Sequence, residues 1–207
     1  MNDQPARRRR APAMSPEDRR EAIAEATLPL LVEHGINVTT SQIAEAAGIA
    51  EGTVFRVFKD KHELLGYCVH TALRVEPLLE ALQAIPRTSD LEALLRAAAD
   101  AMGDHFRRSG ALMHALAASG WRPERPSPDE EQQWHQRRLE QARLTTQAVA
   151  DLLAPEADRL RVAPRTVAGM FLGLVFTDQM GRRAFGETAP ASTDELIDVF
   201  LHGVLAR

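Results

Sequence analysis

The chain is poor in cysteine, in aromatic residues and in long apolar runs. Its single cysteine, Cys68, excludes an intrachain disulfide and a cysteine-cluster metal site. Aromatic residues make up only 5% of the sequence, which favours an all-α protein over a β-rich one. The longest uncharged apolar run, residues 167–176, is too short to cross a bilayer, and Arg7–Arg10 is not followed by the apolar core of a signal peptide. We therefore expect a cytoplasmic protein without a membrane partner.

Strong positive charge is also missing, because the formal net charge is −4. Bulk charge thus gives no support for nucleic-acid binding, and any such function must depend on a local arrangement of residues. The four consecutive arginines Arg7–Arg10 lie in residues 1–14, which we predict to be a flexible basic arm. Such a run is usually a solvated surface, but it can also reach phosphates or the minor groove beside a DNA-binding motif.

Capping signals predict the helices of the first third of the chain. Ser15, followed by Pro16 and Asp18, predicts a helix over residues 16–34, and Pro29 inside it predicts a kink or a loosened turn. Two short helices follow over 41–47 and 51–57, with Gly48 as a left-handed cap between them. A capping box at Asp60 begins a further helix that we expect to run to about residue 82.

Apolar spacing predicts helices throughout the rest of the chain, for about nine in total. They cover residues 90–107, 111–118, 129–153, 165–185 and 193–205, with loops at 121–128 and 186–192 and a turn at 154–164 that has room for a short helical piece. The 165–185 segment is apolar almost all round, so we expect it to be buried on more than one side.

Residues 39–58 contain two short helices joined by a glycine turn, the spacing of a helix-turn-helix. Ala44 and Ala47 are small where the two helices would cross. Ile49, Val54 and Phe58 would anchor the second helix on the core, which leaves its other side facing outwards. The alternative is an αα-hairpin with a purely structural role.

The outward residues and their flanks are our candidates for DNA contacts. Gly52 allows close approach of the backbone, the hydroxyls and helix N-termini can bind phosphate, and Arg56 can pair with guanine or with phosphate. Base specificity is expected mainly from Ser41, Gln42, Glu51, Thr53 and Arg56. The full set is Thr39, Thr40, Ser41, Gln42, Glu51, Gly52, Thr53, Phe55, Arg56, Lys59 and Lys61.

Over about residues 17–66 the sequence resembles the TetR family of bacterial transcriptional regulators. The matching residues are Gly35, Thr39-Thr40, Ile43-Ala44, Ala47-Gly48-Ile49, Gly52-Thr53-Val54-Phe55, Phe58, Lys61 and Glu63-Leu64-Leu65. Three positions depart from the usual pattern: Ala50 replaces a hydroxyl cap, Phe55 replaces a frequent tyrosine, and Val57 replaces a frequent histidine. The resemblance implies a three-helix helix-turn-helix domain over 15–66 and an all-helical ligand-binding and dimerisation domain over 67–207.

A ligand sensor needs a pocket, and the middle helices supply large or adaptable side chains for one. At any single position the ordinary interpretation is plain core packing, and both interpretations stay open. His105 and His114 lack the i,i+4 spacing of helical metal ligands, so we expect no metal site. The candidates are Met102, His105, Phe106, Met113, His114, Trp121, Trp134, Met170, Phe171, Phe176, Thr177, Asp178 and Gln179.

Gly169 and Gly173 lie four residues apart, a spacing that lets a second helix approach closely. This approach can be intrachain packing. The family resemblance implies instead that this helix and the last one pair with their symmetry mates in a homodimer. The candidate dimer residues are Gly169, Gly173, Met180, Leu196, Phe200 and Val204.

These observations predict a homodimeric repressor that binds a double-stranded, palindromic operator and is released by a small-molecule effector. Two alternatives remain: a helical ligand-binding or protein-interaction module without DNA binding, and an all-α enzyme. The sequence contains no Gly-rich phosphate loop and no G-x-S-x-G motif, so we assign no catalytic residue and no cofactor.

Overall fold

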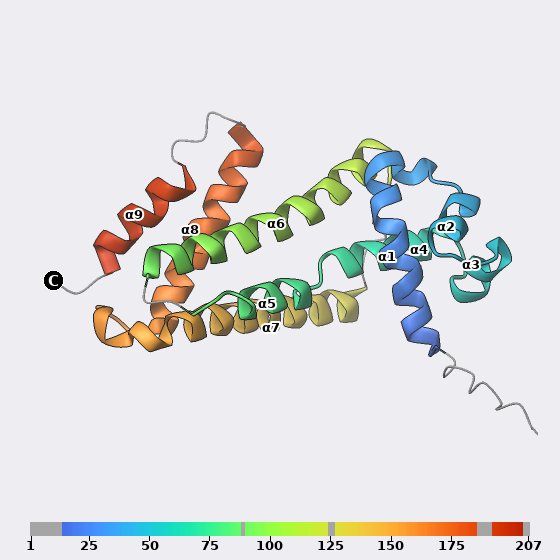
Figure 1. The fold of residues 1–207 in the computed structure, drawn as a ribbon. Helices are drawn as coiled ribbons and strands as arrows, with labels where there is room; N and C mark the ends of the chain where they lie inside the picture. Colours follow the sequence, from blue (N-terminus) through green and yellow to red (C-terminus); the bar gives the residue numbers. More distant parts are fainter. Residues whose placement is uncertain (1–13, 88–89, 124–126, 186–191, 205–207) are drawn as a thin grey trace, which may run out of the picture. The chain divides into compact units, whose positions relative to one another are not determined.

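The computed structural model describes residues 14–87, 90–123, 127–185 and 192–204, without the side chains of 182–185 and 204. The regular elements in these ranges are helical, which confirms the all-α prediction (Figure 1). The Arg7–Arg10 arm lies outside the described residues. In chain order the elements are α1 (Pro16–His34), η1 (Gly35–Asn37), α2 (Thr40–Ala46), α3 (Glu51–Val57), α4 (Lys61–Ala72), α5 (Glu76–Gln83), α6 (Leu91–Ala118), α7 (Pro128–Leu153), η2 (Ala154–Arg159), α8 (Pro164–Phe185) and α9 (Thr193–Val204).

The chain divides into two compact units. The first comprises residues 1–72 together with 114–121, and the second comprises 73–113 and 122–207. The division differs from the boundary after residue 66 that the sequence suggested, because all of α4 and the end of α6 belong to the first unit.

The first unit is built on α1. Ser15 and Asp18 form the expected capping box at its N-terminus, and α1 continues through Pro29 to His34. The helices α2 and α4 pack against it. Its apolar core is fully sequestered from solvent, so each large side chain there contributes about 1.5–3 kcal/mol by burial. The buried residues include Ile23, Ala24, Leu31, Val38, Ile43, Ala44, Val54, Phe58, Leu64, Leu65, Cys68 and Leu116.

The prediction of one helix from residue 61 to about 82 was wrong. The chain leaves the helix after Ala72 and enters a new one, α5, at Glu76. Pro77 explains the break, because it has no N–H to donate to the carbonyl of Leu73 but fits well in the first turn of a helix.

The prediction of two helices, 90–107 and 111–118, was also wrong, because α6 runs unbroken from Leu91 to Ala118. The hydroxyl of Ser109 donates back to the carbonyl of His105 at 2.9 Å, so this polar group is satisfied within the helix. Gly110 costs an α-helix only about 1 kcal/mol, which the packing of α6 outweighs.

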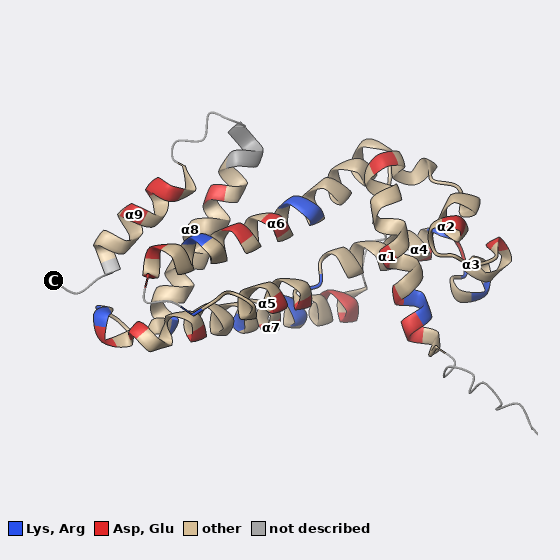
Figure 2. Ribbon diagram, in the orientation of Figure 1, with Lys and Arg blue, Asp and Glu red and all other residues tan. Residues whose placement is uncertain are grey.

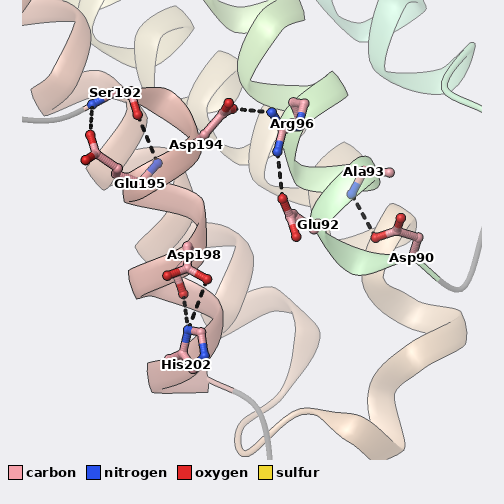
Figure 3. A network of polar contacts seen from close by, with 9 residues as sticks. All are labelled: Asp90, Glu92, Ala93, Arg96, Ser192, Asp194, Glu195, Asp198 and His202. Atoms are coloured by element: carbon pink, nitrogen blue, oxygen red, sulfur yellow. Dashed lines mark hydrogen bonds and ion pairs between the residues drawn. The ribbon is translucent and has the colours of Figure 1, made fainter.

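The second unit packs α5, α6, α8 and α9 with the C-terminal half of α7 around one apolar core. The core includes Leu78, Leu82, Leu94, Leu95, Ala98, Met102, Val149, Leu152, Leu153, Val167, Ala168, Phe171, Val175, Ile197 and Leu201. At one end of this unit Arg96 of α6 pairs with Asp194 of α9 and, at 2.6 Å, with Glu92 (Figure 3). The exposed pair of Arg96 and Asp194 links the start of α9 to the start of α6.

Helix α8 is buried on one side only, contrary to the expectation from its apolar sequence. Val167, Phe171 and Val175 point into the core. On another side Met170 is 55% exposed and Phe176 is 50% exposed. A single copy of the chain therefore leaves an apolar surface of α8 uncovered.

Candidate nucleic-acid interface

The helix-turn-helix begins at a capping box that uses two of the predicted DNA-binding residues. The hydroxyl oxygen of Thr39 accepts the backbone N–H of Gln42 at 3.2 Å, and the side-chain oxygen of Gln42 accepts the backbone N–H of Thr39 at 2.7 Å. Both side chains thus define the start of α2. The sequence analysis assigned Thr39 and Gln42 to phosphate or base contacts and did not predict that they cap α2.

The turn between α2 and α3 is a Schellman motif. Gly48 has φ +65°, and its N–H donates to the backbone carbonyl of Glu45 at 3.1 Å. The N–H of Ile49 donates to the backbone carbonyl of Ala44 at 2.9 Å. No atom lies within 4 Å of the place where a Cβ on Gly48 would stand, so the turn needs glycine for its backbone conformation rather than for space.

Helix α3 has one buried side and one exposed side, as predicted. Val54 and Phe58 are each 1% exposed and fix the helix to the core, whereas Ile49 is only half-buried. On the outer side Phe55 is 51% exposed, and α3 carries both acidic and basic side chains (Figure 2). The exposed members of the predicted DNA-binding set are Thr39, Ser41, Glu51, Gly52, Phe55, Arg56 and Lys59, and the half-buried ones are Thr40, Gln42, Thr53 and Lys61.

Lys61 differs in placement from the other predicted cations. Its ammonium group donates to the carbonyls of Ile36 and Val38, at 2.6 Å each, in the segment that leads into α2. Lys61 therefore binds the protein's own backbone, whereas Arg56 and Lys59 have side chains for which no ion pair or hydrogen bond is found within the described part of the chain.

Arg20 on α1 is a residue that the sequence interpretation missed. Its guanidinium donates to the carbonyl of Val57, the last residue of α3, at 2.8 Å, and to the carboxylate of Glu63 at 2.7 Å. It also lies over the rings of Phe58 and Tyr67, with centroid distances of 4.5 and 5.0 Å. Partners that are 37 to 47 residues away give no local signal in the sequence.

Glu63 accepts hydrogen bonds from two parts of the chain. Besides the Arg20 guanidinium, it accepts the backbone N–H of Lys59 at 2.6 Å. These two interactions, the one with Arg20 first, lower the pKa of the Glu63 carboxyl below its ordinary value. The carboxylate is therefore ionised at neutral pH and holds Arg20 against the segment that follows α3.

The end of α6 contributes to the first unit. A second Schellman motif ends this helix, with Gly120 at φ +88° and the N–H of Trp121 donating to Leu116 at 2.9 Å. Trp121 is 8% exposed and stacks on His62 of α4, with ring centroids 6.0 Å apart. Trp121 and His114, predicted as pocket residues of the second domain, thus belong to the first unit, because that unit includes the end of α6.

The other pocket candidates are distributed between core and surface. Met102 and Phe171 are buried in the core of the second unit, whereas Met113, Trp134 and Met170 are 37%, 47% and 55% exposed. Two of these five side chains thus belong to the core, and three lie at the surface.

A smaller aromatic group does form between α6 and α8. The ring of Phe106 lies 5.8 Å from that of Phe176, edge to face, and 6.0 Å from that of His105. Burial, followed by the charge of Arg108, lowers the pKa of His105. The hydroxyl of Thr177 donates to the carbonyl of Gly173 in its own helix at 2.9 Å.

The predicted dimer residues also differ in placement. Gly169 and Gly173 are exposed and Met180 is half-buried, whereas Leu196 and Phe200 are partly covered by their own chain. The ring of Phe200 lies 5.8 Å from that of Phe171 in the core, so Phe200 contributes to intrachain packing. The side chain of Val204 lies outside the described residues, and the large exposed apolar groups of this region are instead Met170, Phe176 and Val199.

The described ranges contain neither a metal centre nor a membrane span. Within them, no group of three or more His, Cys, Asp or Glu side chains is arranged to hold a metal ion. None of the helices described here is long and apolar enough to span a membrane.

Comparison with known proteins identifies the helix-turn-helix. Residues 23–68, which contain most of α1, all of α2 and α3 and most of α4, match the sequence model of "Bacterial regulatory proteins, tetR family". Over these residues the chain is similar to the tetR family. This match confirms the resemblance found in the helix-turn-helix motif.

A curated relative supports the same assignment. The chain is 34% identical over 103 residues to the HTH-type transcriptional regulator BetI of Escherichia coli. The match covers 48% of this chain and 52% of BetI, so the chain aligns with about half the length of this relative.

Solved structures of a TetR-family regulator and of the repressor SmeT share the fold. A protein from Mesorhizobium loti described as a TetR-family transcriptional regulator has a TM-score of 0.60 at 18% identity, over 93% of this chain and 100% of that one. SmeT, described as the repressor of the Stenotrophomonas maltophilia multidrug efflux pump SmeDEF, has a TM-score of 0.51 at 21% identity, over 90% of both chains. SmeT in complex with triclosan gives a TM-score of 0.52 at 22% identity, over 91% of this chain and 92% of that one. At these identities the likeness concerns the fold alone.

Proposed function

We propose that the protein is a sequence-specific DNA-binding transcriptional regulator that acts in the cytoplasm as a repressor. The observation that carries this proposal is the outer side of α3. Val54 and Phe58 fix the helix to the core, and the glycine, aromatic and basic residues beside them stay exposed. A helix held in this way can enter the major groove, while backbone amides and hydroxyls at the N-termini of α2 and α3 approach phosphates.

We propose further that the protein acts as a homodimer on a palindromic operator. The exposed side of α8 has small residues, Gly169 and Gly173, beside the large apolar Met170 and Phe176. Small residues allow a helix of a second copy to approach closely, and a two-fold axis there makes the contact self-complementary. Such a dimer would present its two recognition helices to successive major grooves, about 34–36 Å apart.

The effector that releases the repressor is, in this proposal, a small molecule bound by the second unit. SmeT, which has the same fold, forms a complex with triclosan. A ligand that prefers one conformation typically changes DNA affinity by about 1–3 kcal/mol. In a thermal-shift screen of apolar metabolites and antibiotics, compounds that stabilise the chain should weaken DNA binding roughly five- to 150-fold. Stabilising compounds that leave the DNA affinity unchanged would contradict release by a ligand.

DNA binding itself is tested by fluorescence anisotropy with the DNA upstream of the protein's own gene, at low salt and without added ligand. The matched pair of variants is Arg56→Ala on α3 and Arg138→Ala on α7, both at exposed arginines. Arg56→Ala should cost about 1–3 kcal/mol of binding free energy, and Arg138→Ala should bind like the wild type. If the wild-type protein binds no fragment there better than unrelated DNA, the proposal of a regulator fails.

A further inference from the structure

Two cations outside α2 and α3 bind the backbone at the two ends of the helix-turn-helix. We propose that Lys61 and Arg20 are positioning residues for DNA binding: they fix the segments before α2 and after α3 and do not contact phosphate themselves. This inference rests on the proposed DNA-binding function and assigns to Lys61 a role different from the phosphate contact that the sequence suggested.

The first clamp, formed by Lys61, holds the segment that precedes α2. The Lys61 ammonium binds the carbonyls of Ile36 and Val38 at 2.6 Å each. From the other side, the hydroxyl oxygen of Ser119 accepts the N–H of Ile36 at 3.1 Å. The next residue, Thr39, is the N-cap of α2. The position of this cap is therefore set by charge-assisted hydrogen bonds, which are stronger than neutral ones.

The second clamp, formed by Arg20, holds the segment that follows α3. Its bond to Val57 satisfies one of the carbonyls that a helix leaves without an internal partner at its C-terminus, where a positive charge is favoured. The planar guanidinium lies over the rings of Phe58 and Tyr67, which restricts its orientation. The side chain of Arg20 is only 24% exposed, so the group is held in one arrangement.

The charge of Arg20 is matched within the protein. Glu63 binds the guanidinium with one carboxylate oxygen and the N–H of Lys59 with the other. The Tyr67 hydroxyl, from the same helix as Glu63, donates to Glu17 of α1 at 2.7 Å. Because these interactions keep the Arg20 guanidinium against Val57 and Glu63, it is not directed at a DNA phosphate.

Both clamps matter because α3 is short and lacks a cap of its own. The helix has seven residues, and Ala50 at its N-cap makes no side-chain hydrogen bond. Contacts to base edges tolerate displacements of only about half an ångström. Loosening either end should therefore weaken binding to the specific site more than binding to unrelated DNA, which depends on phosphate contacts.

The salt dependence of binding separates a positioning residue from a phosphate contact. Each phosphate that the protein neutralises contributes roughly 0.9 to the slope of log K against log salt concentration. Removing a positioning residue should lower the specific affinity and leave this slope unchanged. Removing a lysine that contacts phosphate should flatten the slope by roughly 0.9, the contribution of one phosphate.

The experiment measures dissociation constants of the full chain for the upstream fragment and for unrelated DNA over a series of salt concentrations. The variants are Arg20→Lys, which keeps the charge but loses the two-pronged donor group, and Lys61→Met, which keeps the apolar stem. Lys59→Met is the control, because Lys59 is exposed and its side chain has no hydrogen bond or ion pair within the described part of the chain.

We expect Arg20→Lys and Lys61→Met to lower specific affinity at least about tenfold, to lower the ratio of specific to non-specific binding, and to keep the wild-type salt slope. We expect Lys59→Met to flatten the slope by about 0.9 and to keep the ratio. A flattened slope for Lys61→Met or Arg20→Lys, or an unchanged specific affinity, overturns the inference.

A structural readout covers variants that fold less well. Hydrogen exchange should speed up locally, at residues 57–59 in Arg20→Lys and at 39–43 in Lys61→Met, while circular dichroism stays that of the wild type. Glu63→Gln weakens the clamp formed by Arg20 without changing Arg20 itself. It should lower the ratio of specific to non-specific binding and leave the salt slope unchanged. Global unfolding of Arg20→Lys together with wild-type specificity in Glu63→Gln also overturns the role of Arg20. If wild-type protein does not bind DNA, the proposed function fails instead.

Discussion

The Ser119 side chain at the end of α6 lies directly against Gly35 at the end of α1. A Cβ on Gly35 would stand 2.7 Å from the Cβ of Ser119 and closer still to its hydroxyl oxygen. Real Cβ atoms essentially never approach other atoms that closely, so the contact requires glycine at position 35 for space. It also requires glycine for conformation, because φ of Gly35 is +56°.

We predict that Gly35→Ala destabilises the protein far more than Gly48→Ala. Both glycines have positive φ, so alanine is strained at either position, by about 1–2 kcal/mol in a left-handed turn such as that of Gly48. The strain is larger at Gly35, whose ψ of −139° lies outside the left-handed helical region. Only Gly35→Ala adds a steric clash, worth about 1–3 kcal/mol, since nothing lies within 4 Å of the place where a Cβ on Gly48 would stand. Thermal and urea unfolding of the two variants measure the difference. Ser119→Gly should recover part of the loss in Gly35→Ala and none of that in Gly48→Ala; equal melting temperatures for the two alanine variants would refute the contact.

Cys68 should be unreactive in the folded protein. It is completely buried in the first unit, and burial raises the pKa of its thiol to about 12. At pH 8 the thiolate, which is the reactive form, is therefore almost absent. A chromogenic disulfide reagent should titrate no thiol in native protein and one thiol per chain in denaturant. Rapid labelling of native protein, or DNA binding that changes with mild oxidant, would show that this region opens.

The short helices of the DNA-binding motif could be predicted because their signals are local. The glycine turn at Gly48 and the cap of the next helix at Asp60 placed α3 at residues 51–57, and the alternation of Val54 and Phe58 with exposed neighbours identified its buried side. The break before Pro77 and the continuity of α6 through Gly110 were not predicted, because local signals alone do not decide them. Whether a helix tolerates such a residue depends on the tertiary packing around it, which no short segment contains.

The residues that position the motif could not be predicted in the same way. Arg20 reaches Val57 and Glu63 across 37 and 43 residues, and only the packing of α1 against α4 brings these groups together. Lys61 looked like a phosphate-binding cation because a sequence shows the charge but not the two carbonyls that it binds. Similarly, because α8 is apolar almost all round, its sequence did not show which side of the helix packs in the core of its own chain.

Acid should destabilise the protein partly through Glu63. Its pKa is lowered in the folded state by Arg20 and the Lys59 N–H, so the carboxylate contributes stability that is present above the unfolded pKa of about 4.5 and is lost as the pH falls through the folded pKa. The melting temperature of Glu63→Gln should thus be lower than that of wild type at pH 7, and the difference should shrink below about pH 4.5. The side chain is 38% exposed, which limits the size of the effect. A difference that is constant from pH 7 to pH 3 would rule out this linkage.

The uncovered side of α8 predicts how the proposed dimer can be separated. Gly173 lies on this side, and no atom is within 4 Å of the place where its Cβ would stand, so Gly173→Arg is sterically allowed in a single chain. It would place a charge and a long side chain in the apolar contact between two copies. Val162→Arg, at a 44% exposed position in the turn before α8, is the matched control.

Sedimentation velocity should show Gly173→Arg as a monomer at concentrations where wild type and Val162→Arg are dimers, with helix content unchanged in circular dichroism. The monomer should also bind the upstream fragment much more weakly, because one recognition helix then binds a half-site without the second. Dimers of unchanged stability in Gly173→Arg would place the contact between copies elsewhere on the molecule. Monomeric wild-type protein would contradict the proposed two-fold arrangement of the recognition helices altogether.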